Sequence, residues 1–364
     1  MALLAIGLHA AFASAATFVM WLYRSFVRPG RDLGRRYGAW AVVTGATDGI
    51  GRGMALELAR QGLHLVLIGR NPVKLSRVGD EVQKAAPSCK VRSVVFDLAG
   101  DAPKMSRGVA RVAAAVEGLD VGILVNNAGA TYPGAAYFHE VETPVWEAVV
   151  RVNVEAATRI AGVVVPAMAM KRRGAVVNVG SGSSVVLPAF PLYAVYAASK
   201  AATFESTLME PLDGNFLIST AKEDRESRTI APSFKCRWFY VVLCCCSVLC
   251  YMNRNCGRYI DQFSRSLSIE YKQYEVDLQC QIPLYVATKM SRVGNSLFIP
   301  SPEEYAKAAV RCIGYEAGCV PYWRHSIQCF FASLLPDLAL NAWRLRVGIR
   351  KRREMKAPLG EDGS

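Results

Sequence analysis

A tyrosine and a lysine four positions apart, Tyr196 and Lys200, have the residue types and spacing for proton transfer. Residues four apart lie on one face of a helix, so the ammonium can approach the phenol. A phenol has a pKa of about 10, and lowering it by about 3 units needs roughly 4 kcal/mol of differential stabilisation. A neighbouring cation favours the phenolate and supplies part of that energy. The pair therefore suits acid–base work on a substrate oxygen.

A glycine-rich turn near the start of the chain indicates a nucleotide site. Residues 44–51 read TGATDGIG and separate an apolar strand pattern from a helical pattern. At such a junction Gly45 allows the tight turn, Gly49 lets the backbone approach a pyrophosphate, and Gly51 permits close packing of helix on strand. This position between strand and helix favours a dinucleotide site over a chance glycine repeat.

The residue that closes the second strand distinguishes the two nicotinamide cofactors. A carboxylate about 20 residues past the turn would bind the ribose 2′-hydroxyl of NAD. This chain has Arg70, 19 residues after Gly51, with Lys74 one turn later. Arginine can pair with a 2′-phosphate, which favours NADPH. The alternative is a solvated arginine at a strand end.

The elements that position these residues alternate along the chain. Past Gly38, short apolar runs are separated by helical stretches, a pattern typical of βαβ units. Strands are predicted at 39–44, 63–69, 91–96, 121–125, 175–179 and 276–281, and helices at 50–61, from Pro72, and at 102–117, 144–170 and 302–315. The expected fold class is α/β, a Rossmann-type doubly wound parallel sheet with its sites at the carboxyl ends of the strands.

Five motifs occur in a fixed order: TGxxxGIG at 44–51, NNAG at 126–129, Asn153, NxxS at 178–181 and YxxxK at 196–200. This set resembles the short-chain dehydrogenase/reductase family, over most of 39–318. The resemblance implies that Tyr196 donates a proton to a carbonyl oxygen as hydride arrives, and that Lys200 holds the ribose hydroxyls. It further implies that Ser181 holds the substrate carbonyl and that Asn153 anchors a water. It assigns cofactor contacts to Thr44, Gly45, Asp48, Gly49, Ile50, Gly51, Arg70, Asp97, Asn126, Ala128, Tyr196, Lys200 and Thr288.

The serine has an alternative. In the family it commonly lies 13 residues before the tyrosine, which here is Ser183, whereas the NxxS frame selects Ser181, 15 before. Pro188 and Pro191 indicate a loop longer by two residues, so Ser181 is favoured. The family's Pro-Gly after the last strand is replaced by Pro283-Leu284, so the backbone on the substrate side is expected to differ there.

Three segments narrow the resemblance: Asn178–Gly182, Pro191–Tyr196 and Gln281–Met290, together with the apolar N-terminus. They resemble very-long-chain 3-oxoacyl-CoA reductases, relatives of 17β-hydroxysteroid dehydrogenase type 12, particularly the plant members. The resemblance implies NADPH-dependent reduction of very-long-chain 3-oxoacyl-CoA in fatty-acid elongation, at the endoplasmic reticulum membrane, beside other elongase subunits. Reduction of a steroid or another hydrophobic ketone is the alternative.

Charge and hydropathy favour a membrane partner. From Ala2 to Tyr23 the only ionisable side chain is His9, and a helix of that length spans about 33 Å. Residues 24–36 hold five arginines against one aspartate, and 344–356 hold seven lysines and arginines against one glutamate; they supply +10 of the net charge of +13. Charge beside apolar segments is typical of a cytosolic membrane flank and does not favour nucleic acid. A cleaved signal peptide or a buried core helix are the alternatives for this segment.

The predicted organisation has three parts. Residues 1–38 form a membrane anchor with a basic flank, 39–325 an NADP-binding reductase domain, and 326–364 a membrane-associated apolar segment with a basic tail. The catalytic domain is expected in the cytosol because the arginines follow the anchor. Cysteine and histidine spacing matches no metal site, so no metal is expected.

Residues 202–258 interrupt this pattern. Joining Ala201 to Tyr259 restores an amphipathic continuation of the Tyr–Lys helix, and six of the eleven cysteines lie within the intervening segment. The segment is interpreted as an insertion, such as translated non-coding sequence. The functional alternative is a membrane or redox loop. Because the insertion directly follows the catalytic helix, an impaired subunit of an elongase is a further hypothesis.

Overall fold

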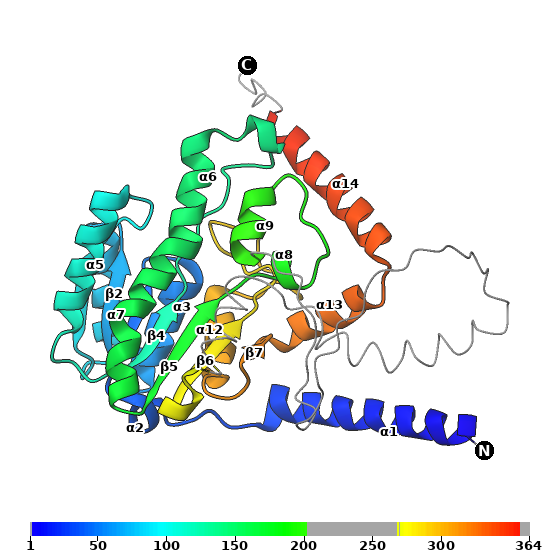
Figure 1. Cartoon of the computed structure of the whole chain (residues 1–364), viewed down its shortest axis with the longest axis horizontal. Coiled ribbons are helices and arrows are strands. Elements are labelled where there is room, and N and C mark those ends of the chain that lie inside the picture. The colour runs from blue at the N-terminus through cyan, green and yellow to red at the C-terminus, as the bar shows by residue number, and fades with distance from the viewer. Residues whose placement is uncertain (1, 202–267, 269, 357–364) are drawn as a thin grey trace, which may run out of the picture.

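A seven-stranded sheet organises the chain, and all of its neighbouring strands pair in parallel. The structure, a computed structural model, describes residues 2–201, 268 and 270–356. The strand order is β3-β2-β1-β4-β5-β6-β7, which confirms the doubly wound α/β class (Figure 1). The strands are β1 (Trp40–Thr44), β2 (His64–Gly69), β3 (Val91–Val95), β4 (Val121–Asn126), β5 (Gly174–Val179), β6 (Val276–Gln281) and β7 (Gly318–Cys319).

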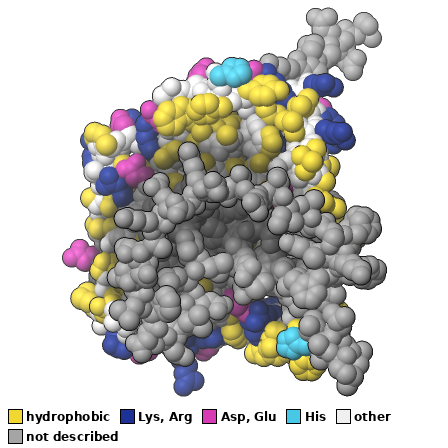
Figure 2. Space-filling model, turned by 45° about the vertical axis from the view of Figure 1, so that its right-hand side comes forward, with side chains coloured by type: hydrophobic (Ala, Val, Ile, Leu, Met, Phe, Trp, Pro, Cys, Tyr) yellow, Lys and Arg dark blue, Asp and Glu magenta, His cyan; other side chains and the backbone are white. Residues whose placement is uncertain are grey.

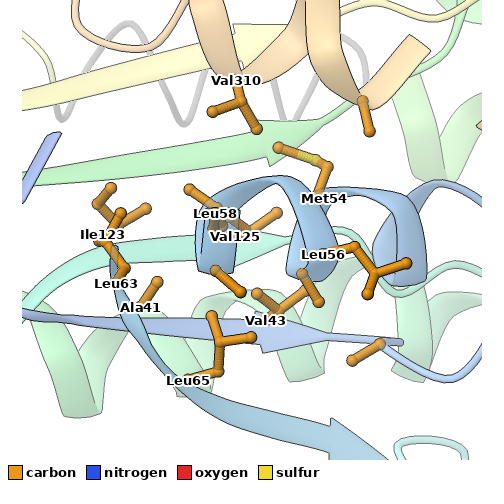
Figure 3. Packing of buried hydrophobic residues seen from close by; sticks show 14 of the residues in the cluster. Ala41, Val43, Met54, Leu56, Leu58, Leu63, Leu65, Ile123, Val125 and Val310 are labelled. Carbon is orange, nitrogen blue, oxygen red and sulfur yellow. The ribbon is translucent and has the colours of Figure 1, made fainter. Parts of the chain in front are cut away.

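Helices cover both faces of the sheet. One face carries α3 (Gly49–Arg60), α4 (Pro72–Ala85) and α12 (Pro302–Arg311), and the other carries α5 (Ala102–Val116) and α7 (Ala156–Met170). Figure 3 shows Met54 and Leu58 of α3 packed between β1, β4 and Val310 of α12. Burial of this apolar surface, at about 25 cal/mol per Å², is the main force that fixes the layers.

The carboxyl ends of the strands bring the motifs to one edge. Thr44 of β1 is paired with Ile68, Asn126 of β4 with Asn178, and Val179 of β5 with Gln281. The segments after these strand ends are the glycine turn, the NNAG motif, the NxxS serine and the 283–288 loop. Parallel pairing therefore assembles them at one end of the sheet.

Two predicted helices differ from the structure. The segment 144–170 divides into α6 (Thr143–Val150), a π-helical turn η3 (Arg151–Glu155) and α7, because a π turn accommodates an extra residue that periodicity does not reveal. The helix predicted to end at 315 ends at Arg311, before Gly314 with a φ of 82°, a conformation that stops a helix. The two-residue strand β7 was not predicted.

The N-terminal helix α1 (Ala2–Leu22) continues into a π-helical turn η1 (Tyr23–Val27) and projects from the body (Figure 1). Among the described residues, Gly7–Val27 alone is a helix long and apolar enough to cross a membrane, with mean hydropathy 1.2 and no buried part. The expected anchor is thus a candidate transmembrane helix.

The basic flank of α1 contacts protein as well as solvent. Arg28 pairs with Glu316 at 2.5 Å, and its guanidinium carbon lies 4.0 Å from the centroid of the Tyr315 ring. In the short helix α2 (Leu33–Tyr37), Leu33 and Tyr37 are buried in the main core. The flank therefore attaches the anchor to the sheet domain, a role that charge counting did not predict.

The C-terminal region forms two helices, α13 (Trp323–Ser333) and α14 (Asp337–Lys356). On α14, Leu340 and Arg344 are buried against the domain, whereas Leu338 is exposed, as is Phe331 on α13. Figure 2 shows hydrophobic side chains beside lysine and arginine side chains on this side of the molecule. Membrane association of 326–364 stays a prediction, and the 202–258 insertion lies outside the described residues.

Candidate active site

The tyrosine of the YxxxK motif lies against the serine of the NxxS motif. Tyr196 is on helix α9 (Ala194–Ala201), and its hydroxyl donates to Ser181 Oγ at 3.4 Å. Ser181 Oγ lies 2.8 Å from Ser183 Oγ and accepts from the Ser183 amide at 3.2 Å. Both candidate serines therefore lie at the Tyr196 hydroxyl, and the preference for Ser181 over Ser183 stays a prediction.

The lysine of the motif is buried. Lys200 Nζ donates to the carbonyl of Val179 at 3.1 Å, and burial lowers the pKa of Lys200 to about 8. A Cβ on Gly129 would lie 3.3 Å from Lys200 Nζ and 3.5 Å from Asn153 Oδ1. The last residue of the NNAG motif therefore lies beside the ammonium, and the lysine stays largely charged near pH 7.

Asn153 lies in the π-helical turn η3, and its side chain is 1% exposed. Its Oδ1 accepts from the Ala130 amide at 2.8 Å, and its Nδ2 donates to the Ala130 carbonyl at 3.0 Å and to Ser199 Oγ at 2.8 Å. The side chain thus joins the NNAG loop to α9 next to Lys200. π turns frequently occur at functional sites, and the expected role of Asn153 in anchoring a water stays a prediction.

The electrostatics of Tyr196 keep it protonated. Burial raises the pKa of Tyr196, and hydrogen bonds with Ser181 and Ser183 act in the opposite direction. A protonated phenol next to a serine hydroxyl is suited to give a proton to a carbonyl oxygen.

The glycine turn forms a cradle that a Cβ would fill. Gly45 and Gly49 have φ values of 63° and 52°, which favour glycine. A Cβ on Gly49 would lie 3.0 Å from Thr288 Cγ2, so Thr288 borders the turn. Asp48 caps α3 by accepting from the Gly49 amide at 2.9 Å, and Lys289 lies 3.1 Å from its carboxylate. The turn thus presents the N-terminus of α3, with Ile50 and Gly51 in its first turn, as a phosphate-binding end.

Two predicted cofactor residues have scaffold contacts instead. Thr44 Oγ1 accepts from the amides of Asn127 and Ala128, each at 3.0 Å. Asn126 Nδ2 donates to Asn178 Oδ1 at 3.0 Å inside the sheet. Their side chains tie β1, β4 and β5 together, so their predicted contacts with a cofactor stay predictions. Asn127, absent from the predicted contacts, donates to the carbonyl of Thr44 at 3.0 Å; its position in NNAG was the available signal.

The predicted ribose and adenine contacts lie at neighbouring strand ends. Arg70 directly follows β2 and is exposed, and Asp97, close after β3, is exposed and accepts from the Ala99 amide at 3.2 Å. Because β2 and β3 pair in parallel, both side chains lie on the side of the sheet that carries the glycine turn. Arg70 and Asp97 thus lie at the same end of the sheet as the glycine turn, and their contacts with a cofactor stay predictions.

A buried histidine that the sequence did not reveal holds the 283–288 loop. His325 on α13 is 0% exposed; its Nδ1 accepts from the Leu284 amide at 3.3 Å and its Nε2 lies 3.1 Å from the Tyr285 carbonyl. These contacts require a neutral ring with the proton on Nε2. In the same loop, the Pro283 carbonyl accepts a hydrogen bond from the Gly182 amide at 2.8 Å. His325 therefore supports the loop that lies beside Ser181.

We expect this histidine to make stability depend on pH. Burial lowers the pKa of His325 to about 4, against about 6.5 in the unfolded chain. Between these values only the unfolded chain binds the proton, so stability is complete above about pH 6.5 and falls as the pH drops toward 4. Lowering the pH from 7 to 4.5 should reduce the free energy of unfolding of the wild type by roughly 2 to 3 kcal/mol more than that of His325→Asn. Urea unfolding at the two pH values measures both changes. Equal losses in both proteins would contradict this assignment.

The parallel sheet, the glycine turn and the Tyr–Lys pair define a class of protein. Residues 39–211 match the short chain dehydrogenase family. A solved short-chain dehydrogenase from Sphingobium yanoikuyae in complex with NADPH has the same fold, with a TM-score of 0.53, 19% identity, and coverage of 89% of this chain and 98% of that one. The chain belongs to the short-chain dehydrogenase family, whose members bind NAD(P)H, and it is an oxidoreductase of that family.

Two curated relatives are similar over most of this chain. It is 40% identical to a very-long-chain 3-oxoacyl-CoA reductase-like protein of Arabidopsis thaliana, covering 91% of this chain and 88% of the relative. It is 33% identical to the inactive hydroxysteroid dehydrogenase-like protein 1 of Homo sapiens, covering 84% and 75%. The relatives thus include a protein named for acyl-CoA reduction and one named as inactive.

Proposed function

We propose that the chain reduces very-long-chain 3-oxoacyl-CoA to 3-hydroxyacyl-CoA with NADPH. The observation that supports this most is the contact between Tyr196 and Ser181 beside a buried Lys200, in a chain 40% identical to a very-long-chain 3-oxoacyl-CoA reductase-like protein. The substrate class comes from that relative, and the reaction type comes from the geometry.

The proposed mechanism rests on the contacts of the three side chains. Ser181 donates its hydroxyl hydrogen bond to the 3-oxo oxygen, and Tyr196 gives its proton to the same oxygen. A bound reduced nicotinamide supplies the hydride. Lys200, held by Val179, places a positive charge near the phenol, which stabilises the phenolate as the proton leaves. Asn153 fixes the NNAG loop against α9 and supports a water that returns the proton.

NADPH is the proposed cofactor because the exposed end of β2 is cationic. Arg70 is exposed there, and Lys74 lies in the first turn of α4, where its amide donates to Asn71 Oδ1 at 3.0 Å. Neither side chain pairs with a carboxylate in the described part of the chain. Both are therefore available to a 2′-phosphate.

A direct assay separates this function from reduction of a steroid. Microsomes containing the chain would be offered a very-long-chain 3-oxoacyl-CoA and a 17-ketosteroid side by side, with tritiated NADPH. We expect tritium to pass into the 3-hydroxyacyl product. Transfer to the steroid alone would replace the proposal, and transfer to neither would favour a subunit without catalytic activity.

The insertion at 202–258 is the specific observation that favours such an impaired subunit. In the sequence the insertion begins two residues after Lys200, and an interruption of the helix there would leave the carbonyls of its last turn without intrahelical partners. We expect deletion of 202–258 to raise kcat at least about tenfold, because Tyr259 would then continue the helix and fix the lysine, whereas the loop closure itself costs little. Steady-state kinetics and thermal unfolding, which should sharpen, measure this. Equal kcat with and without the segment would show that the insertion does not disturb the site.

We place the chain at the endoplasmic reticulum membrane, among elongase subunits, with the catalytic domain in the cytosol. The apolar helix Gly7–Val27 and the arginines after it support this orientation. Protease added to sealed microsomes should digest the residues beyond Arg36. Complete protection until detergent is added would place the domain in the lumen.

A further inference from the structure

Helix α14 lies against the loops that surround the catalytic tyrosine. A Cβ on Gly348 would lie 3.0 Å from Leu192, in the loop that leads to α9. About one turn to either side of Gly348, Arg344 and Lys351 contact the Tyr285 side chain of the 283–288 loop. Figure 1 shows α14 beside α9 and reaching toward α6. Part of the basic tail therefore belongs to the substrate side of the site.

Two cations gather there, and we call them the cationic cluster: Arg344 and Lys351. Arg344 has its guanidinium carbon 4.0 Å from the centroid of the Phe190 ring, and its NH1 donates to the Tyr285 hydroxyl at 3.4 Å. Lys351 Nζ lies 5.2 Å from the centroid of the Tyr285 ring. Burial raises the pKa of the Tyr193 phenol, and the charges of Arg292 and Arg344 oppose part of that rise.

The cluster lacks an internal anion. No carboxylate in the described part of the chain pairs with either of its members, although other cations are paired: Arg352 with Glu140, Arg350 with Glu354 and Lys289 with Asp48. Arg344 is only 5% exposed, and its Nε has no hydrogen-bond partner. A buried cation without an anion is costly, and the aromatic contacts offset only part of that cost.

The position of the cationic cluster near Tyr196 indicates which anion would pair with it. The Phe190 ring makes the cation–π contact with Arg344, and its centroid lies 6.4 Å from that of the Tyr196 ring. Only the Phe190 ring therefore separates Arg344 from the phenol that is proposed to protonate the substrate. An acyl-CoA has an uncharged acyl chain and thioester but a phosphate-bearing end, and arginine and lysine are the side chains that bind phosphate.

We propose that the cationic cluster on α14 binds the phosphate-bearing end of a CoA thioester, with Lys351 and Arg344 as its main determinants. That the substrate is an acyl-CoA rests on the proposed function. The part of the substrate that is bound, and the residues that bind it, are assigned from the contacts of α14, because no sequence motif marks them. We therefore expect a site that distinguishes a CoA thioester from the same acyl group on a carrier without phosphate.

The test measures binding apart from turnover. The full chain in uncharged detergent, saturated with NADP⁺, would be titrated with coenzyme A and, separately, with pantetheine, which has no phosphate. Lys351→Met and Arg344→Met should each weaken coenzyme A binding about tenfold, as expected for loss of one charge-assisted contact, and leave pantetheine binding unchanged. Arg346→Met is the matched control because Arg346 is exposed on the same helix; it should change neither.

Kinetics and lipid binding separate the remaining outcomes. Both cluster variants should raise KM for a 3-oxoacyl-CoA with little change in kcat, and leave KM for the matching N-acetylcysteamine thioester unaltered. If coenzyme A binding depended on the cluster but the chain did not turn over acyl-CoA, the site would be supported and the proposed function would be refuted. Equal weakening of coenzyme A and pantetheine, or no weakening by Lys351→Met, would overturn the site. If the two cluster variants lost binding to vesicles of anionic lipid but still bound coenzyme A normally, the proposed coenzyme A site would also be overturned. The cluster would then be assigned to lipid phosphates.

Discussion

Tyr196→Phe should lower kcat for the 3-oxo substrate roughly a thousandfold while leaving the affinity for NADPH nearly unchanged. The substitution removes only the hydroxyl that contacts Ser181 at 3.4 Å, and the ring can keep its place 6.4 Å from Phe190. General acid catalysis contributes about 10² to 10⁴ in rate, so loss of the proton donor should fall in that range. Steady-state rates and NADPH fluorescence titration measure the two quantities.

Tyr193→Phe is the matched control for that result. Tyr193 lies in the same loop-to-helix segment and stacks on Tyr132 at 5.8 Å between centroids, and its hydroxyl makes no hydrogen bond within the described residues. We expect its kcat to stay within about threefold of the wild type. Lys200→Ala should impair both turnover and NADPH affinity, since the proposed function gives Lys200 a role toward both the phenol and the ribose. Activity of Tyr196→Phe within about tenfold of wild type, or about 1.4 kcal/mol of barrier, would show that another group donates the proton.

Arg70→Asp should reduce the ratio of kcat/KM for NADPH over that for NADH by about a hundredfold. The change removes a charge-assisted contact to the 2′-phosphate and places a carboxylate at the position that binds a free ribose 2′-hydroxyl. Arg70 is exposed after β2, and its side chain makes no ion pair in the described part of the chain, so the fold should tolerate the substitution.

The control for cofactor choice is a charge reversal on the neighbouring helix. Arg77→Asp alters α4 at a residue that is 62% exposed at its side chain and pairs with Glu81 at 3.6 Å. Its effect on the cofactor ratio should stay below about threefold, because surface charges are screened by salt over about 10 Å. Equal use of NADPH and NADH by the wild type would remove the proposed role of Arg70.

Local patterns in the sequence were sufficient for the sheet and for the order of the motifs. The predicted strand 276–281 coincides with β6, and the predicted start of a helix at Pro72 coincides with that of α4, where Asn71 accepts from the Lys74 amide. Such features depend on neighbours within a few residues: apolar runs, caps and glycine turns act locally. Parallel pairing then places the carboxyl ends of the strands together, so the approximate location of the site could be predicted from the sequence.

Contacts between distant segments decided the rest. The serine that touches Tyr196, the support of the 283–288 loop by His325, and the burial of Arg344 against Phe190 each join residues from different elements. None of these pairs has a spacing that periodicity can detect, because its members lie in different elements that only the tertiary fold brings into contact. The sequence alone marked the C-terminal cations as membrane-facing charge. Only the tertiary structure shows that Arg344 and Lys351 face inward, because the packing of one helix face against the 187–193 and 283–288 loops determines where each cation lies.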